Sequence, residues 1–252
     1  YRLWFMVFRH GGAAALTHRA EPAIRAVSPA VLAALAVVAP TLWWWQSAPA
    51  LRALADTAAV CALGLTVVGY LDGELARRAG RLLGTVGLCW LLLETVRLGV
   101  LTQLAAGFDP TPYTLWVYAS QTRAGFANLV AVLAAALLCC CVWTGAPRLA
   151  AAGLVVTGLL TRTLAGHLAA TPVGTVLLAV HVVAAGLWCG TLLALVLTVR
   201  HRSGWARALP AYSRLALPCV VLLLGSGVVG ALLVLDSPHA LYGTAYGWLL
   251  VA

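Results

Sequence analysis

The chain has 252 residues and a formal net charge of +9; 63% of its residues are hydrophobic and only 9% are charged. Soluble proteins carry about 25% charged residues, which cover most of a water-facing surface. The composition therefore excludes soluble, disordered and fibrous proteins. It also excludes a transmembrane β-barrel, whose strands alternate apolar and polar residues. We predict an all-α polytopic transmembrane helix bundle.

Seven apolar segments reach, or nearly reach, the length of about 20 residues that a helix needs to cross a bilayer. Residues 1–28 precede them, carry charge and glycine, and are predicted to form a cytoplasmic tail. The predicted spans are residues 29–46, 53–71, 82–104, 125–143, 149–166, 173–199 and 215–235. An eighth span is expected to open at Gly247, so we expect the sequence to be cut from a longer protein.

All 16 basic residues are arginines, and most of them lie between the apolar segments. In a soluble domain this excess would suggest nucleic-acid binding, but beside membrane spans arginines mark the cytoplasmic side. Twelve arginines fall on one side of the predicted bundle, and only Arg52 and Arg123 fall on the other. We therefore predict a cytoplasmic N-terminus and no nucleic-acid partner. The outer loops are then residues 47–52, 105–124, 167–172 and 236–246.

Ionisable residues inside spans are costly in hydrocarbon, so each is a functional hypothesis. Asp56, Glu94, Arg97 and Arg162 all fall in the outer parts of predicted spans, which indicates a polar vestibule that opens outward. Two alternatives remain open. Glu94 and Arg97 are three residues apart and could pair along one helix face. Arg162 could reach the outer headgroups or pair with Glu94 or Asp56.

Three histidines, His167, His181 and His239, also fall on the predicted outer side. Neutral imidazole is the commonest metal ligand near pH 7. His167 lies just before a six-residue loop that leads into the sixth span, so His181 can approach it across a hairpin. His181 lies roughly 10 Å below the start of its helix, at 1.5 Å per residue. These three residues are the candidate metal ligands.

Seven cysteines all lie in apolar runs, where a disulfide framework is not expected. Soft thiolates suit Cu(I), so Cys89, Cys141 and Cys189, in the inner halves of spans, form a candidate thiol path. The alternative, which we favour, is that the cysteines are small apolar packing residues. The chain has one methionine, which excludes a thioether ladder.

Several short motifs in the last part of the chain occur together and in order. They are Gly166-His167, the run from His181 to Trp188-Cys189-Gly190, the run from Tyr212-Ser213 to Ala216, the pair Gly225 and Gly227, and the run from Thr244 to Leu250. Residues 150–252 thereby resemble the copper-resistance D family of bacterial inner-membrane proteins. The earlier spans are similar to that family only in hydropathy and helix number, so we divide the membrane part at residues 29–148 and 149–252.

The resemblance implies copper handling at the bacterial inner membrane, usually uptake toward the cytoplasm, with copper as Cu(I) or Cu(II). It implies His167 and His181 as ligands, and Trp188 and Gly190 as packing residues. It also implies a periplasmic copper-binding partner, or fusion to a membrane domain that resembles cytochrome-oxidase-assembly proteins, as in actinobacteria. The acids Asp56 and Glu94, with Asp109 and Asp236 in the loops, would attract the cation. Arg97 and Arg162 oppose it unless those acids neutralise them.

Two other functional classes remain open. One is a haem-binding electron carrier of b-type cytochrome architecture, because histidines on adjacent helices can ligate haem iron. The other is a non-transporting assembly or scaffold protein. We do not expect an enzyme, since the sequence has no hydrolase motif and no glycine-rich loop that ends in lysine.

Overall fold

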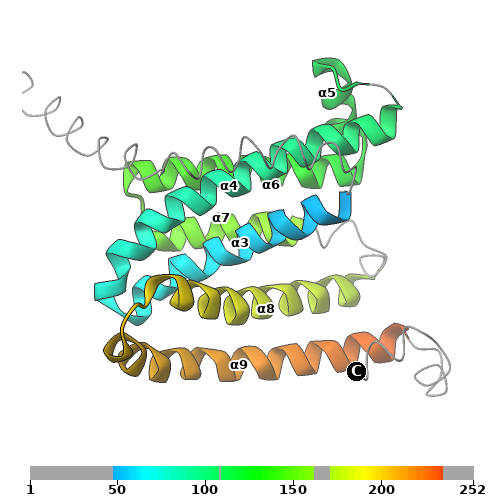
Figure 1. The fold of residues 1–252 in the computed structure, drawn as a ribbon. Helices are drawn as coiled ribbons and strands as arrows, with labels where there is room; N and C mark the ends of the chain where they lie inside the picture. Colours follow the sequence, from blue (N-terminus) through cyan, green and yellow to red (C-terminus); the bar gives the residue numbers. More distant parts are fainter. Residues whose placement is uncertain (1–47, 108, 162–170, 235–252) are drawn as a thin grey trace, which may run out of the picture.

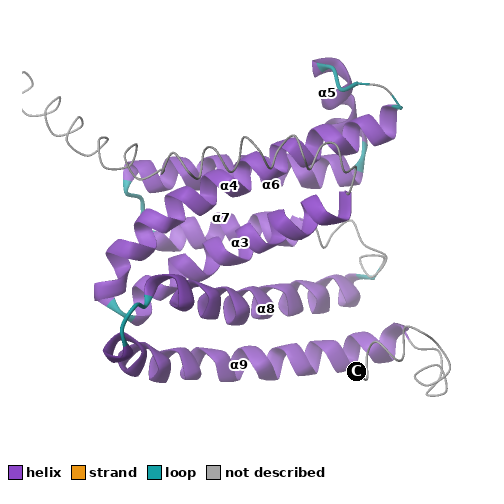
Figure 2. Ribbon diagram, in the orientation of Figure 1, coloured by secondary structure: helices purple, strands orange, loops and turns teal. Residues whose placement is uncertain are grey.

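The computed structural model describes residues 48–107, 109–161 and 171–234, and all regular structure in that part is α-helical (Figures 1 and 2). The helices are α3 (Ala48–Leu71), α4 (Gly73–Ala106), α5 (Pro112–Gln121), α6 (Arg123–Thr144), α7 (Arg148–Thr161), α8 (Pro172–Thr198) and α9 (Arg202–Val234). Five of them, α3, α4, α6, α8 and α9, are long and apolar enough to cross a membrane. The predicted all-α class is confirmed.

The predicted spans 53–71, 125–143 and 173–199 coincide closely with α3, α6 and α8, and the span 82–104 lies within the longer helix α4. The fifth span, predicted for 149–166, is described only as α7, which ends at Thr161. The first span, at 29–46, and the helix expected from Gly247 lie outside the described residues. The number of spans and the side on which the N-terminus lies therefore stay predictions.

The structure corrects the boundaries at the predicted arginine-rich loops. Helix α4 already begins at Gly73, because the Asp72 side chain accepts a 2.8 Å hydrogen bond from the Glu74 backbone N–H and caps the helix. Arg77, Arg78 and Arg81 therefore lie on helical turns rather than in a loop.

Helix α9 begins at Arg202, well before the predicted residue 215, and continues through Pro210 and Pro218. Each proline removes one backbone donor and usually marks a helix boundary. Burial of Ala208 and Tyr212 against the neighbouring helices holds this part of α9 in place.

The predicted outer loop 105–124 contains the short helix α5, which the sequence reading missed. Its start is a capping box. The Thr111 hydroxyl accepts from the Thr114 N–H at 3.2 Å, while the Thr114 hydroxyl accepts from the Thr111 N–H at 2.8 Å. Pro112 occupies the first turn, where its missing N–H costs nothing.

The helices pack in the order α9, α8, α3 and α4, with α6 and α7 completing the bundle behind α3 and α4 (Figure 1). The core lies among α3, α4, α6, α7 and α8, where Leu63, Trp90, Leu138, Val155 and Leu195 are fully buried. Helix α9 covers one edge and leaves much of its apolar surface exposed. A large exposed apolar face of this kind fits contact with a lipid bilayer.

Helices α3 and α8 approach closely at two glycines. A Cβ atom at Gly64 would collide with the Gly190 carbonyl oxygen, and one at Gly190 would collide with the Val60 carbonyl oxygen. Small residues allow such close packing between membrane helices. The expectation that Gly190 is a packing residue is confirmed. This contact positions α8, the helix that carries His181, against α3.

The arginines gather at one end of the bundle, on the left in Figure 1, where α3, α6 and α8 end and α4, α7 and α9 begin. We call this the basic end; it comprises Arg77, Arg78, Arg81, Arg148, Arg200, Arg202 and Arg207. Arg52 and Arg123 lie at the opposite end, which we call the α5 end. The separation of charge on which the orientation prediction depends is thus present in the fold.

Candidate functional site

His181 of α8 contacts Ser226 of α9, with 3.0 Å between His181 Nδ1 and Ser226 Oγ. The Ser226 hydroxyl also lies 2.6 Å from the Leu222 carbonyl oxygen, which can only accept. A hydroxyl has one proton to donate, so Ser226 donates to Leu222 and accepts from the His181 Nδ1–H. This network assigns the proton of the neutral ring to Nδ1, and Nε2, which has no hydrogen-bond partner among the described residues, then carries a lone pair that can bind a metal ion.

His181 lies between α8 and α9, beside a glycine of α9. Its side chain is half-buried, whereas Ser226 is only 8% exposed. Gly227 lies beside the ring, and even an added Cβ there would remain 3.8 Å from His181 Cε1. His181 lies about 14 Å along α8 from its start, at 1.5 Å per residue, on the part of the helix nearer the α5 end.

The other predicted ligands, His167 and His239, lie outside the described residues, as do Arg162 and Asp236. In the described part of the chain, no group of three or more His, Cys, Asp or Glu side chains is placed to hold a metal ion. His181 is therefore the one candidate histidine ligand whose geometry can be described.

Glu94 lies at the centre of a buried hydrogen-bond network between α4 and α6. Its carboxylate is 0% exposed and accepts from Trp90 Nε1 at 3.1 Å, from Asn128 Nδ2 at 2.8 Å and from Arg97 Nη1 at 3.4 Å. The predicted pairing of Glu94 with Arg97 along one helix face is present in the structure. A carboxylate with three donors and no exposed surface is closed to a cation in this arrangement.

Asp56 lies on α3 and forms an ion pair with Arg52 at 3.7 Å. Its side chain is 38% exposed. Asp56 therefore lies near the start of α3, at the α5 end, and its carboxylate already has a cationic partner there.

Asp109, the acid predicted in the outer loop, is exposed and accepts a 3.3 Å hydrogen bond from Gln103. It therefore lies beside the end of α4, at the α5 end, where a carboxylate can meet cations from solution.

The predicted thiol path consists of Cys89 on α4, Cys141 on α6 and Cys189 on α8. All seven cysteines are free thiols. Cys139 is the member of the Cys139–Cys141 triplet beside α4, since an added Cβ on Gly87 would lie 3.6 Å from its Sγ. The described residues contain no metal-binding group of three, so the three thiols of the predicted path are not gathered in one place.

Sequence reasoning missed three residues that the structure places at these sites: Ser226, Asn128 and Trp90. Each carried a signal. Ser226 is a polar residue between two glycines in an apolar span, and Asn128 is the only asparagine in the chain. Trp90 precedes Glu94 by one helical turn, so its indole N–H can reach the carboxylate.

The family model of copper resistance protein D matches residues 206–252. The matched segment includes Ser226 and most of α9. No curated protein and no solved structure matches the chain. Together with five helices of membrane length, the match indicates a multi-pass membrane protein connected with copper resistance, and it does not favour the haem or scaffold alternatives. The predicted resemblance to the copper-resistance D family is confirmed over residues 206–252, and the motifs that contain His167 and His181 lie outside the matched segment.

Proposed function

We propose that this protein moves copper across a bacterial inner membrane and that His181 is one of its copper ligands. The observation that carries the proposal is the contact between His181 and Ser226. It directs the Nε2 lone pair of a membrane-embedded histidine away from its protein partner, and that partner lies in the segment matched by the copper resistance protein D model.

The chemistry of His181 supports a role as ligand. Imidazole nitrogen suits copper, and histidines that bind metals usually donate their second N–H to a neighbouring acceptor. Ser226 provides that acceptor. We propose His167 and His239 as further ligands. In the sequence, His167 comes shortly before α8, which begins at the α5 end, and His239 comes shortly after α9, which ends there.

The charges near the α5 end support entry of copper from that side. Asp109 has an exposed carboxylate that attracts cations, and the partly exposed carboxylate of Asp56 adds negative charge beside its partner Arg52. Glu94 neutralises the half-buried Arg97. The pairing removes one of the two positive charges that would oppose a cation in the span. Weak binding at several sites would then let copper move on.

We place the α5 end on the outer side, because the basic end carries the arginines that mark the cytoplasm. A periplasmic copper-binding protein, or a fused assembly-like membrane domain, would deliver or receive the metal there. The proposed role is non-enzymatic and assigns no covalent chemistry to the chain.

The test compares the copper content of the purified full chain with that of His181→Ala, after incubation with Cu(I) and removal of free metal. We expect the variant to lose at least one copper site and to slow copper uptake into vesicles of known orientation. His201→Ala is the matched control, because His201 is exposed at the basic end. Unchanged copper content and uptake in His181→Ala would contradict the proposal.

A further inference from the structure

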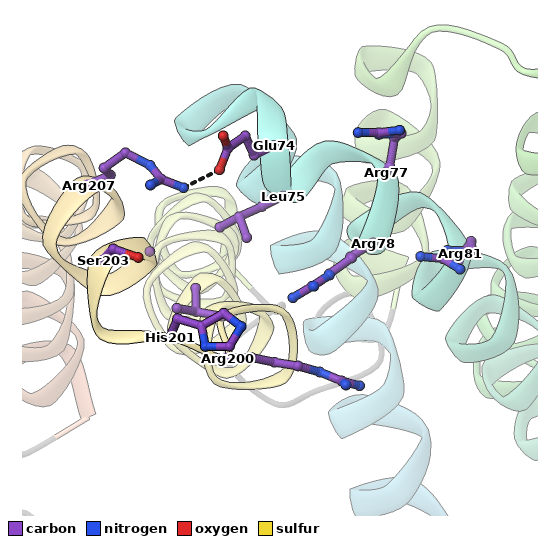
Figure 3. Close-up of a pocket in the computed structure, with 11 residues that line it drawn as sticks. Glu74, Leu75, Arg77, Arg78, Arg81, Arg200, His201, Ser203 and Arg207 are labelled. Atoms are coloured by element: carbon purple, nitrogen blue, oxygen red, sulfur yellow. Dashed lines mark hydrogen bonds and ion pairs between the residues drawn. The ribbon is translucent and has the colours of Figure 1, made fainter.

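A pocket opens at the basic end, between the first turns of α4 and the connection from α8 to α9 (Figure 3). Its volume is about 940 Å³. Its lining is dominated by the arginines Arg77, Arg78, Arg81, Arg200 and Arg207, together with His201 and Glu74. The pocket is strongly positive, and it lies at the opposite end of the bundle from the proposed copper site.

The acids in and beside the pocket are already engaged. Arg207 forms ion pairs with Glu74 and with Asp72, at 3.2 Å from Asp72 Oδ2 (Figure 3 draws the bond to Glu74). Although desolvation opposes the shift, the N–H of Glu74 and the Arg207 guanidinium lower the pKa of Asp72, so it stays ionised. The positive charge of the other lining arginines is therefore not compensated by these two carboxylates.

Four lining arginines, Arg77, Arg78, Arg81 and Arg200, form no ion pair with any carboxylate that the structure describes. Arg78 donates to the Thr198 carbonyl oxygen at 3.3 Å, which directs its guanidinium toward the end of α8 (Figure 3). Arginines from α4 and from the α8–α9 connection thus line one pocket without a described carboxylate partner, and arginine binds phosphate through paired N–H donors.

The pocket continues into a second cavity of about 450 Å³, which shares Arg78, Arg81 and Arg200 with the first. Its other lining residues are Leu82, Thr85 and Leu197, which lie farther along α4 and α8 toward the middle of the bundle. Leu197 is 46% exposed. The combined groove thus has arginines at its mouth and apolar side chains below them.

We propose that this groove binds an anionic phospholipid, with its phosphate held by Arg81 and Arg200 and an acyl chain lying along Leu82 and Leu197. Basic pockets between transmembrane helices are suited to anionic headgroups. The apolar continuation favours a lipid over a soluble phosphate, which would leave Leu82 and Leu197 uncovered. The proposal rests on the membrane character of the chain and is independent of the copper proposal.

Such a lipid would connect α4 to the α8–α9 connection, which few polar contacts join. The contacts of α4 with the end of α8 and the start of α9 include the Arg78–Thr198 hydrogen bond and the ion pairs of Arg207 with Asp72 and Glu74. A phosphate between Arg81 on α4 and Arg200 after α8 would add a further contact. Anionic lipid should therefore raise the thermal stability of the protein as well as bind to it.

The test uses the full chain in nanodiscs of phosphatidylglycerol or phosphatidylcholine, with bound lipid counted by native mass spectrometry. The side chains of Arg81 and Arg200 make no hydrogen bond or ion pair with another described residue, so Arg81→Gln/Arg200→Gln should keep its helical content. We expect it to bind phosphatidylglycerol roughly thirtyfold more weakly, because each arginine near an anionic surface contributes about a fivefold to sixfold gain.

The matched control is Arg202→Gln/Arg214→Gln, which removes the same charge from exposed positions of α9 outside the pocket lining. The proposal is overturned if the two double variants lose phosphatidylglycerol equally, or if neither loses it. Competition with inorganic phosphate gives a second readout. Displacement of phosphatidylglycerol by low millimolar phosphate would show a soluble-anion site instead. Equal retention of phosphatidylglycerol and phosphatidylcholine by the unaltered chain would also overturn the proposal, whether or not the variant folds.

Discussion

Glu94 and His181 are both polar residues in membrane-length helices, and the sequence reading assigned both to one outward-facing region. Their surroundings differ sharply. Glu94 is fully buried and accepts hydrogen bonds from three side chains on α4 and α6. His181 is half-buried and has one described hydrogen-bond partner, Ser226 on α9.

Glu94 and His181 show two ways in which the bundle accommodates a polar group in hydrocarbon. A polar group in an apolar interior is stabilised either by hydrogen-bond partners within the protein or by contact with a ligand or with water. Glu94 has partners within the protein, and its hydrogen bond with Asn128 joins α4 to α6. His181 is suited to contact with a ligand, because Ser226 holds Nδ1 and Nε2 has no partner among the described residues. The first site is structural, and the second is suited to a ligand.

The largest expected effect comes from removing the buried carboxylate. Glu94→Ala should lower the free energy of unfolding by about 3–5 kcal/mol, because it leaves the Arg97 charge and two other donors without their acceptor. Denaturation of the purified protein in detergent measures the loss. Glu74→Ala, at an exposed position of the basic end, is the control and should cost far less. Equal losses in the two variants would contradict a structural role for Glu94.

A second prediction concerns the close contact between α3 and α8, the helix that carries His181. Gly190→Ala should destabilise the protein by about 1–3 kcal/mol, because the added methyl group collides with the Val60 carbonyl oxygen and forces α8 away from α3. Gly153→Ala on α7 is the matched control, since nothing lies within 4 Å of a Cβ there. Thermal unfolding of both variants measures the difference. A neutral Gly190→Ala would show that α3 and α8 are not in close contact at this point.

A third prediction separates Ser226 from a merely structural role. If His181 binds copper as proposed, Ser226→Ala should weaken copper binding by roughly 10–100-fold, because the partner that orients a metal-binding histidine is lost. Copper competition titrations measure the affinity, and Ser226→Thr should restore it in part by returning a hydroxyl. Ser120→Ala, on exposed α5, is the control. An unchanged copper affinity in Ser226→Ala would remove the support for the assigned tautomer.

The smallest predicted effect lies at the basic end. The pKa of Asp72 is lowered in the folded protein, so its contribution to stability is present above the ordinary pKa of about 4 and is lost as pH falls through the lower folded value. Asp72→Asn should therefore cost about 1 kcal/mol or less at pH 7, because Arg207 is half exposed. The difference from the unaltered chain should shrink below pH 4. Unfolding measured from pH 7 to pH 3 checks this; a constant difference would contradict the ion pair as its cause.

The parts of the fold that could be predicted are those that depend on local composition. Continuous apolar runs predicted α3, α4, α6 and α8 closely, since a long apolar run can satisfy its backbone in lipid only as a helix. Helices α4 and α9 begin before the predicted spans, because a charged residue interrupts an apolar run without ending a helix. The Asp72 cap begins α4, and burial of Ala208 and Tyr212 holds the first turns of α9 in place. Helix α5 was missed because its capping box lies in a polar segment.

At the candidate site, too, some residues could be predicted from the sequence and others could not. His181 and Glu94 stood out in the sequence because ionisable residues are rare in apolar spans. Their partners did not. Ser226 lies 45 residues from His181, and Asn128 lies 34 residues from Glu94. Hydrogen bonds over such separations depend on which helices are neighbours, and the apolar pattern of each helix leaves that undecided.

From its sequence alone, this protein is determined to be an α-helical membrane bundle with its arginines at one end and a resemblance to the copper-resistance D family. These properties follow from local hydrophobicity, charge and short motifs. Only the tertiary structure decided that Glu94 is sealed by its neighbours, that His181 keeps one nitrogen available, and that arginines from α4 and the α8–α9 connection line one groove. The reason is geometric: each of these properties needs side chains from different helices at hydrogen-bonding or ion-pairing distance, and only packing of the helices brings them there.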